Sequence, residues 1–134
     1  MTAFDTNVLI YSCDKQDPVR RQRAIELLAA TPDGVILWQV ACEFVAASRK
    51  LASSGFTERD AWSRLAEFLA LFPLMLPTPS VLTRAQELHE AHRWSFWDAV
   101  IVAGCLEHGV TKFYTEDLPG TVGLPNLVIV NQFV

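Results

Sequence analysis

Two patterns of apolar residues alternate along this chain. Short, fully apolar runs are typical of strands buried on both faces, and apolar residues recurring every three or four positions are typical of amphipathic helices. The expected strands are Thr2–Asp5, Val35–Trp38, Leu74–Leu76, Lys112–Thr115 and Leu127–Val130. Strands that alternate with helices predict an α/β domain, with a parallel sheet and helices on both faces.

Local start and stop signals delimit the helices. Asp17 and Pro18 begin one helix, and residues 31–34 end it. The apolar spacing over residues 40–51 predicts a second helix, which ends around Gly55. An apolar turn is expected at Val8–Tyr11. Thr57 opens a helix with a capping-box variant, and this helix runs through Phe72. Two further helices are expected: one is capped by Ser80 and ends near Arg93, and the other is opened by Ser95 and ends before Gly109.

Composition limits the class of protein. The chain has 134 residues, 51% of them hydrophobic, which predicts one domain over residues 1–134. Its net charge of −4 excludes a protein that binds nucleic acid through bulk positive charge. The most apolar charge-free stretch, residues 68–83, is broken by three prolines, so we expect no membrane span.

The cysteines and the amino terminus indicate a compartment. Three cysteines are an odd number in apolar helical sequence, which predicts buried free thiols in a reducing cytoplasm rather than a disulfide or zinc framework. They are Cys13, Cys42 and Cys105. The amino terminus lacks a basic region and carries an early aspartate, so no secretory signal is expected.

Four carboxylates lie close to predicted strand ends. Asp5 ends the first strand, Glu43 lies in the helix after the second, Asp98 lies in the first turn of the helix that Ser95 opens, and Asp117 follows the fourth strand. Because ligand sites of parallel sheets lie outside the carboxyl ends of the strands, these side chains can converge at one edge.

Each acid also has an ordinary structural explanation. Asp5 can cap a helix, and Asp98 can form a capping box. Glu43 can reach solvent or pair with Arg49, and aspartates such as Asp117 are common in turns. Taken together, however, four clustered carboxylates would repel one another severely without bound cations. Oxygen-only ligands suit Mg²⁺ or Mn²⁺, which activate water and stabilise phosphoryl transition states.

These residues carry a family resemblance that spans essentially the whole chain. The sequence resembles the PIN-domain ribonucleases, and more narrowly the toxin component of VapBC toxin–antitoxin pairs. The matching segments are Asp5–Tyr11, Glu43, Phe96–Ala103, Tyr114–Leu118 and Asn126–Asn131. One departure is Gln132, where the family usually has a proline after the asparagine of the final strand.

The resemblance implies a fold and an activity. The fold is a Rossmann-like three-layer α/β/α sandwich with a central, mainly parallel five-stranded sheet. The activity is that of an Mg²⁺- or Mn²⁺-dependent endoribonuclease acting as a growth-inhibiting toxin of a type II toxin–antitoxin system. By carry-over, the acidic metal-binding set is Asp5, Glu43, Asp98 and Asp117, with support from Thr6, Thr115 and Glu116.

The same resemblance suggests a division of labour and partners. As a hypothesis, Asp5 and Asp98 hold the principal cation with help from Glu43, and Asp117 serves a second ion or a water molecule. The family forms homodimers and pairs with an antitoxin whose tail lies across the active site. The crowded apolar residues between Leu51 and Phe72 independently predict a homodimer surface or a groove for a partner segment.

Other residues have weaker interpretations. Basic residues gather in a cluster, Arg20, Arg21 and Arg23, and in a pair, Arg49 and Lys50. They either form solvated helix faces or meet RNA phosphates beside the acids. Trp94 and Trp97 are expected in the core or in an interface, although an aromatic side chain near a nuclease site could also stack on a base. The three histidines are expected at the surface or at helix ends; they are His89, His92 and His108.

Two rival functions remain open. A phosphatase or phosphotransferase that uses an aspartyl phosphate would need a second aspartate two residues after Asp5, where this chain has Asn7, and Lys112 is poorly placed as its lysine. Alternatively, the chain is an inactive or non-enzymatic binding module in which the acids hold a structural cation or only cap helices.

Overall fold

The computed structural model describes residues 1–118 and 123–133. The segment between the last two expected strands is rich in proline and glycine, which predicts a loop, and it lies partly outside these described residues. The described strands are β1 (Thr2–Phe4), β2 (Gly34–Leu37), β3 (Leu74–Met75), β4 (Lys112–Tyr114) and β5 (Val128–Val130). The helices are α1 (Thr6–Cys13), α2 (Pro18–Ala29), α3 (Trp38–Ala47), the 3-10 segment η1 (Ser48–Ser54), α4 (Glu58–Leu71), α5 (Pro79–His92) and α6 (Phe96–Glu107).

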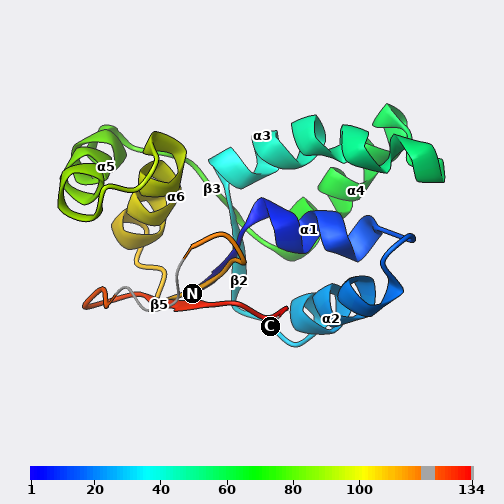
Figure 1. Cartoon of the computed structure of the whole chain (residues 1–134), viewed down its shortest axis with the longest axis horizontal. Helices are drawn as coiled ribbons and strands as arrows, with labels where there is room; N and C mark the ends of the chain where they lie inside the picture. Colours follow the sequence, from blue (N-terminus) through cyan, green and yellow to red (C-terminus); the bar gives the residue numbers. More distant parts are fainter. Residues whose placement is uncertain (119–122, 134) are drawn as a thin grey trace.

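The strands form one sheet in the order β3-β2-β1-β4-β5, with every pair parallel. Helices α1 to α4 lie on one side of the strands, and α5 and α6 lie side by side on the other (Figure 1). This arrangement confirms the predicted α/β fold with a parallel five-stranded sheet.

The strand sequences are mostly apolar because both faces of the sheet are buried in the core. Phe4, Ile36 and Phe113 from three adjacent strands are fully buried. The α6 residues Val102 and Cys105 are buried with them. Burial on both faces of the sheet removes the polar alternation that a half-exposed strand would show.

Three boundary predictions were wrong. The expected turn at Val8–Tyr11 is part of the helix α1, which Asp5 caps by accepting a hydrogen bond from the Thr6 amide. The helix after β2 begins at Trp38 and changes to 3-10 geometry at Ser48. Helix α5 begins at Pro79 with Thr78 as its N-cap rather than Ser80. In each case the helix extends across residues with weak local signals, because tertiary packing supplies most helical stability.

Other local predictions hold. Thr57 and Asp60 form a reciprocal capping box at the start of α4, and Ser95 caps α6 by accepting from the Asp98 amide. All three cysteines are free thiols, but Cys42 is exposed on α3, contrary to the expectation that all are buried. None of the described helices has the length and apolar character that a membrane crossing requires.

Candidate functional site

The register of the sheet brings Asp5 and Thr115 together. Phe4 of β1 pairs with Tyr114 of β4, so the residues that follow each strand are also neighbours. The Thr115 hydroxyl donates to Oδ2 of Asp5 at 2.6 Å, and the Thr6 amide donates to Oδ1 at 2.7 Å. Asp5 is therefore fixed at the carboxyl end of the sheet while remaining only 9% exposed.

Glu43 reaches the same place from α3. This helix follows β2 without a loop and packs against α1. The Thr6 hydroxyl donates to Oε2 of Glu43 at 2.8 Å, and Nε2 of Gln39 donates to Oε1 at 2.8 Å. Glu43 forms no ion pair with Arg49 among the described residues, so its carboxylate is held by neutral donors.

The two acids after β4 have different partners. Asp117 accepts from Nδ2 of Asn7 at 3.2 Å, and its amide donates to the Thr115 hydroxyl at 3.1 Å. Glu116 instead accepts a 2.6 Å hydrogen bond from the Tyr11 hydroxyl. Partial burial and this hydrogen bond raise the pKa of Tyr11 to about 12. The turn after β4 is thus held to α1 by both acids, but at different points.

Asp98 is less closely connected to the cluster. It lies half-buried in the first turn of α6, and its carboxylate has no hydrogen bond among the described residues. The residue before it is linked to α3, because the carbonyl of Trp97 accepts from Nε2 of Gln39 at 3.3 Å. Asp98 lies seven residues before Cys105, hence on the same helix face and about 10 Å along the axis.

The buried thiol of Cys105 lies near Asp5. Burial raises the pKa of Cys105, and the charge of Asp5 raises it further. Asp98 lies about two turns away along the same helix.

Electrostatics mark Asp5 as the centre of the cluster. Burial raises its pKa from 3.8 to about 6, and the negative charges of Asp117 and Glu43 add to the increase, although the hydrogen bonds from Thr115 and Thr6 oppose it. The protein therefore holds an ionised Asp5 at a cost in free energy. A bound cation would remove that cost.

A cavity of about 660 Å³ opens beside these acids. Thr6, Glu43, Glu116 and Asp117 line it, whereas Asp5 and Asp98 are not among its lining residues. Among the other lining residues, Asn7 and Tyr11 belong to the segment that carries the family resemblance and Lys50 to the predicted basic pair, whereas Asp14 was not singled out because it fits an ordinary helix-cap pattern. Gln39, which joins Glu43 to the start of α6, was missed for the same reason.

The donor chemistry fits a hard divalent cation. Besides the carboxylates, two buried amide oxygens, Oδ1 of Asn7 and Oε1 of Gln39, lack a hydrogen-bond partner within the described structure. Oxygen donors of this kind are the preferred ligands of Mg²⁺ and Mn²⁺. Within residues 1–118 and 123–133, no three acidic, histidine or cysteine side chains are already gathered at metal-binding positions. The donors are near one another without forming a closed coordination shell.

Of the predicted basic rim, the arginine cluster of α2 lies away from this cavity, whereas Lys50 lines it. Arg20 pairs with Asp17 at 3.0 Å and lies over the Tyr11 ring. Arg23 donates to the carbonyl of Phe133 at 3.4 Å. Arg21 lines a separate cavity of about 300 Å³. None of the three lines the acidic cavity, and their contact with RNA stays a prediction.

The tryptophans before α6 have different environments. Trp94 is in the core, where it stacks on His92 and its carbonyl hydrogen-bonds Nδ1 of His89. Trp97 is 63% exposed, so it is not a core residue. The histidines lie at helix ends, as expected: His89 and His92 in the last turn of α5, and His108 at the end of α6.

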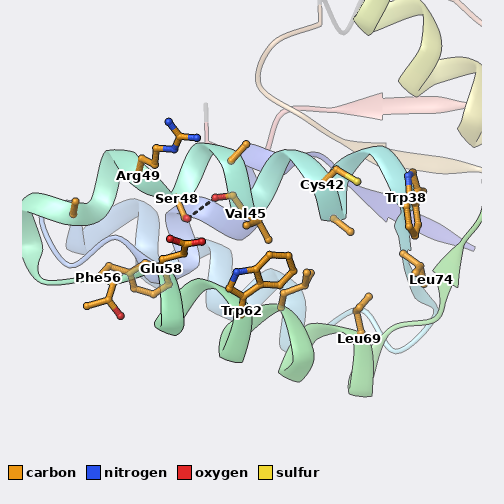
Figure 2. Close-up of a pocket in the computed structure, with 15 residues that line it drawn as sticks. Trp38, Cys42, Val45, Ser48, Arg49, Phe56, Glu58, Trp62, Leu69 and Leu74 are labelled. Atoms are coloured by element: carbon orange, nitrogen blue, oxygen red, sulfur yellow. Dashed lines mark hydrogen bonds between the residues drawn. The ribbon is translucent and has the colours of Figure 1, made fainter.

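An apolar groove of about 980 Å³ runs between α3 with η1 and α4. Figure 2 shows Trp62 of α4 directed toward Val45 of α3, with Trp38 at one end of the groove. The Trp62 side chain is 56% exposed, although Leu65 and Phe68 of the same helix are buried. The apolar residues of α4 therefore divide between the core and this groove.

A parallel α/β sheet with acids at the carboxyl end of its strands defines the class of this protein, and comparison with known proteins refines it. The family model described as the PIN domain matches residues 3–118. The chain belongs to the PIN domain family, as its sequence resemblance indicated.

Solved structures support the same fold. A toxin–antitoxin complex from Klebsiella pneumoniae contains a chain 22% identical to this one, with a TM-score of 0.71 and coverage of 99% of this chain and 98% of that one. The VapBC2 complex from Rickettsia felis, bound to a DNA fragment from its promoter, contains a chain 18% identical, with a TM-score of 0.70 and coverage of 97% of each. No curated protein matches the chain significantly.

The raised pKa of Asp5 predicts a pH-dependent cost to stability. An acid whose pKa is about 6 when folded and 3.8 when unfolded destabilises the fold increasingly as pH rises between these values. Relative to wild type, Asp5→Asn should gain up to about 3 kcal/mol in unfolding free energy from pH 4 to pH 7. Urea unfolding in EDTA measures this difference.

Glu90→Gln, on the exposed face of α5, is the control and should show no such pH-dependent gain. A constant difference between Asp5→Asn and wild type from pH 4 to pH 7 would contradict the electrostatic account of Asp5.

Proposed function

We propose that this protein is a metal-dependent endoribonuclease and the toxin of a type II toxin–antitoxin pair. The observation that carries this proposal is the buried Asp5, whose pKa is raised to about 6 by burial and by the nearby charges of Asp117 and Glu43. Ionising a buried carboxylate beside other negative charges costs free energy, and a bound cation offsets that cost. The bound cation can in turn bind the negatively charged phosphodiester of a nucleic acid. Membership of the PIN domain family and the two toxin–antitoxin neighbours support the same function.

The side chains divide the work. Asp5, Glu43, Asp98 and Asp117 would hold Mg²⁺ or Mn²⁺, which supplies water activation and charge stabilisation at phosphorus. Thr115 orients Asp5 by donating to its Oδ2, and Thr6 orients Glu43 by donating to its Oε2, while each carboxylate oxygen keeps a further lone pair that a cation can share. Gln39 joins Glu43 to the backbone before Asp98 and thereby sets the distance between α3 and α6.

A cleavage assay tests this function. Purified wild-type protein should cleave single-stranded RNA with Mn²⁺ and not with EDTA. Asp5→Asn and Asp98→Asn should each lower the cleavage rate at least about 100-fold, because each removes a carboxylate that the cation needs. Variants that cleave at the wild-type rate would refute the assignment.

Adjacent acids provide the matched comparison within this assay. Asp117→Asn should lower cleavage strongly, because Asp117 is directed to the acid cluster. Glu116→Gln should retain most activity, because an amide oxygen can still accept from the Tyr11 hydroxyl. Equal losses in the two variants would contradict the separate roles of these residues.

We also propose that the groove between α3 and α4 binds an apolar segment of a cognate antitoxin. Its lining is largely aliphatic and aromatic, with Trp62 and Trp38 only half-buried, so a partner's apolar side chains would remove this surface from water. The neighbours with toxin–antitoxin titles support a protein partner of this kind.

Trp62→Glu tests the groove, with Leu71→Glu as control, because Leu71 is also exposed on α4 but does not line the groove. Expression of the chain should arrest bacterial growth, and co-expression of the protein encoded beside its gene should restore it. Trp62→Glu should arrest growth without being rescued, whereas Leu71→Glu should be rescued. Rescue of both variants would contradict the proposed groove.

We further propose that the protein is a cytoplasmic homodimer. Free thiols, two of them buried, suit a reducing compartment, and several large apolar side chains outside the groove are exposed, among them Leu82 and Trp97. Light scattering at micromolar concentration should give twice the chain mass, and a monomer under these conditions would contradict the dimer.

A further inference from the structure

The segment η1 carries two adjacent basic residues that belong to different cavities. Leu51 anchors η1 in the core, and both Arg49 and Lys50 are exposed. Lys50 lines the acidic cavity together with Glu43, Glu116 and Asp117. Arg49 lies by the α3–α4 groove instead, and Figure 2 shows its side chain extending away from α4. These two adjacent residues thus place one basic side chain, that of Lys50, at the acidic cavity and the other, that of Arg49, outside it.

Lys50 is the single basic residue among the described residues that line the acidic cavity. Four carboxylates line it as well, those of Asp14, Glu43, Glu116 and Asp117. The ion pairs of the described residues involve the amino terminus, Arg20, Arg64 and Arg84, and do not include Lys50. Its ammonium group is therefore not committed to a carboxylate. It can offer positive charge to a ligand that enters the cavity.

We propose that Lys50 binds a phosphate of the RNA strand next to the one that is cleaved. This inference rests on the proposed nuclease function. A polyanion entering a cavity lined by carboxylates needs positive charge at the rim as well as at the centre. A lysine ammonium on a long flexible stem binds phosphate as a point charge.

This contact would position the strand without reading its sequence. Phosphate contacts set the register of a nucleic acid and carry no base information. Lys50 is better placed for this role than the arginines of α2, because none of those arginines lines the cavity that Glu43 and Asp117 line. The expected effect of losing Lys50 is therefore weaker substrate binding that is uniform across RNA sequences.

Steady-state cleavage of a short single-stranded RNA with Mn²⁺, over a series of salt concentrations, tests the proposal. Lys50→Ala should raise KM roughly tenfold with little change in kcat. The slope of log(kcat/KM) against log[salt] should become shallower by about 0.7. Lys50→Arg should restore both quantities substantially. Arg49→Ala, which removes the neighbouring charge, should match wild type in both.

The outcomes separate the two proposals. If wild type cleaves RNA but Lys50→Ala keeps the wild-type KM and salt slope, Lys50 does not bind RNA and the nuclease function stands. A fall in kcat alone, or a lower melting temperature of Lys50→Ala in EDTA, would show that Lys50 acts on the carboxylates and would also overturn the inference. If wild type cleaves no RNA with Mn²⁺, the nuclease function fails and this inference fails with it.

Discussion

The mutual repulsion of carboxylates in a partly buried place is the constraint on which this structure depends. Asp5 has lost most of its hydration, and the charges of Glu43 and Asp117 oppose its ionisation. Hydrogen bonds from Thr115 and Thr6 offset only part of this cost, because neutral donors stabilise a carboxylate less than a cation does. Uncharged residues would be less costly to bury at this place. Carboxylates that are buried despite such a cost are typical of functional sites.

The parallel sheet makes the arrangement possible. Because β1 and β4 are parallel and Phe4 is paired with Tyr114, the next residues, Asp5 and Thr115, lie side by side at the carboxyl ends of the two strands. Helices α1 and α3 begin directly at the ends of β1 and β2, so their first two turns bring Thr6 and Glu43 over the same edge. The rigid backbone of adjacent strands thus fixes groups that lie up to 110 residues apart in the chain. Loops would position the same groups less precisely.

Much of the fold was predictable because its signals are local. All five strands were found from their apolar runs, and the capping residues Thr57 and Ser95 marked the correct helix starts. Helix α1 was missed because four apolar residues in succession lack the helical period, and the helix forms by packing between α2 and α3. Cys42 was expected to be buried, but it is exposed on α3, where it lines the groove toward α4.

The sequence by itself determined the order of strands and helices, the acidic residues near strand ends and the resemblance to the PIN domain family, because these depend on residue type and spacing along the chain. Only the tertiary structure decided which groups meet. It directs Glu116 to Tyr11 and Asp117 to Asn7, makes Gln39 the link between α3 and α6, and separates Lys50 from Arg49. Side-chain partners and the pKa of Asp5 depend on distances and burial across the whole fold, and local sequence patterns do not encode those quantities.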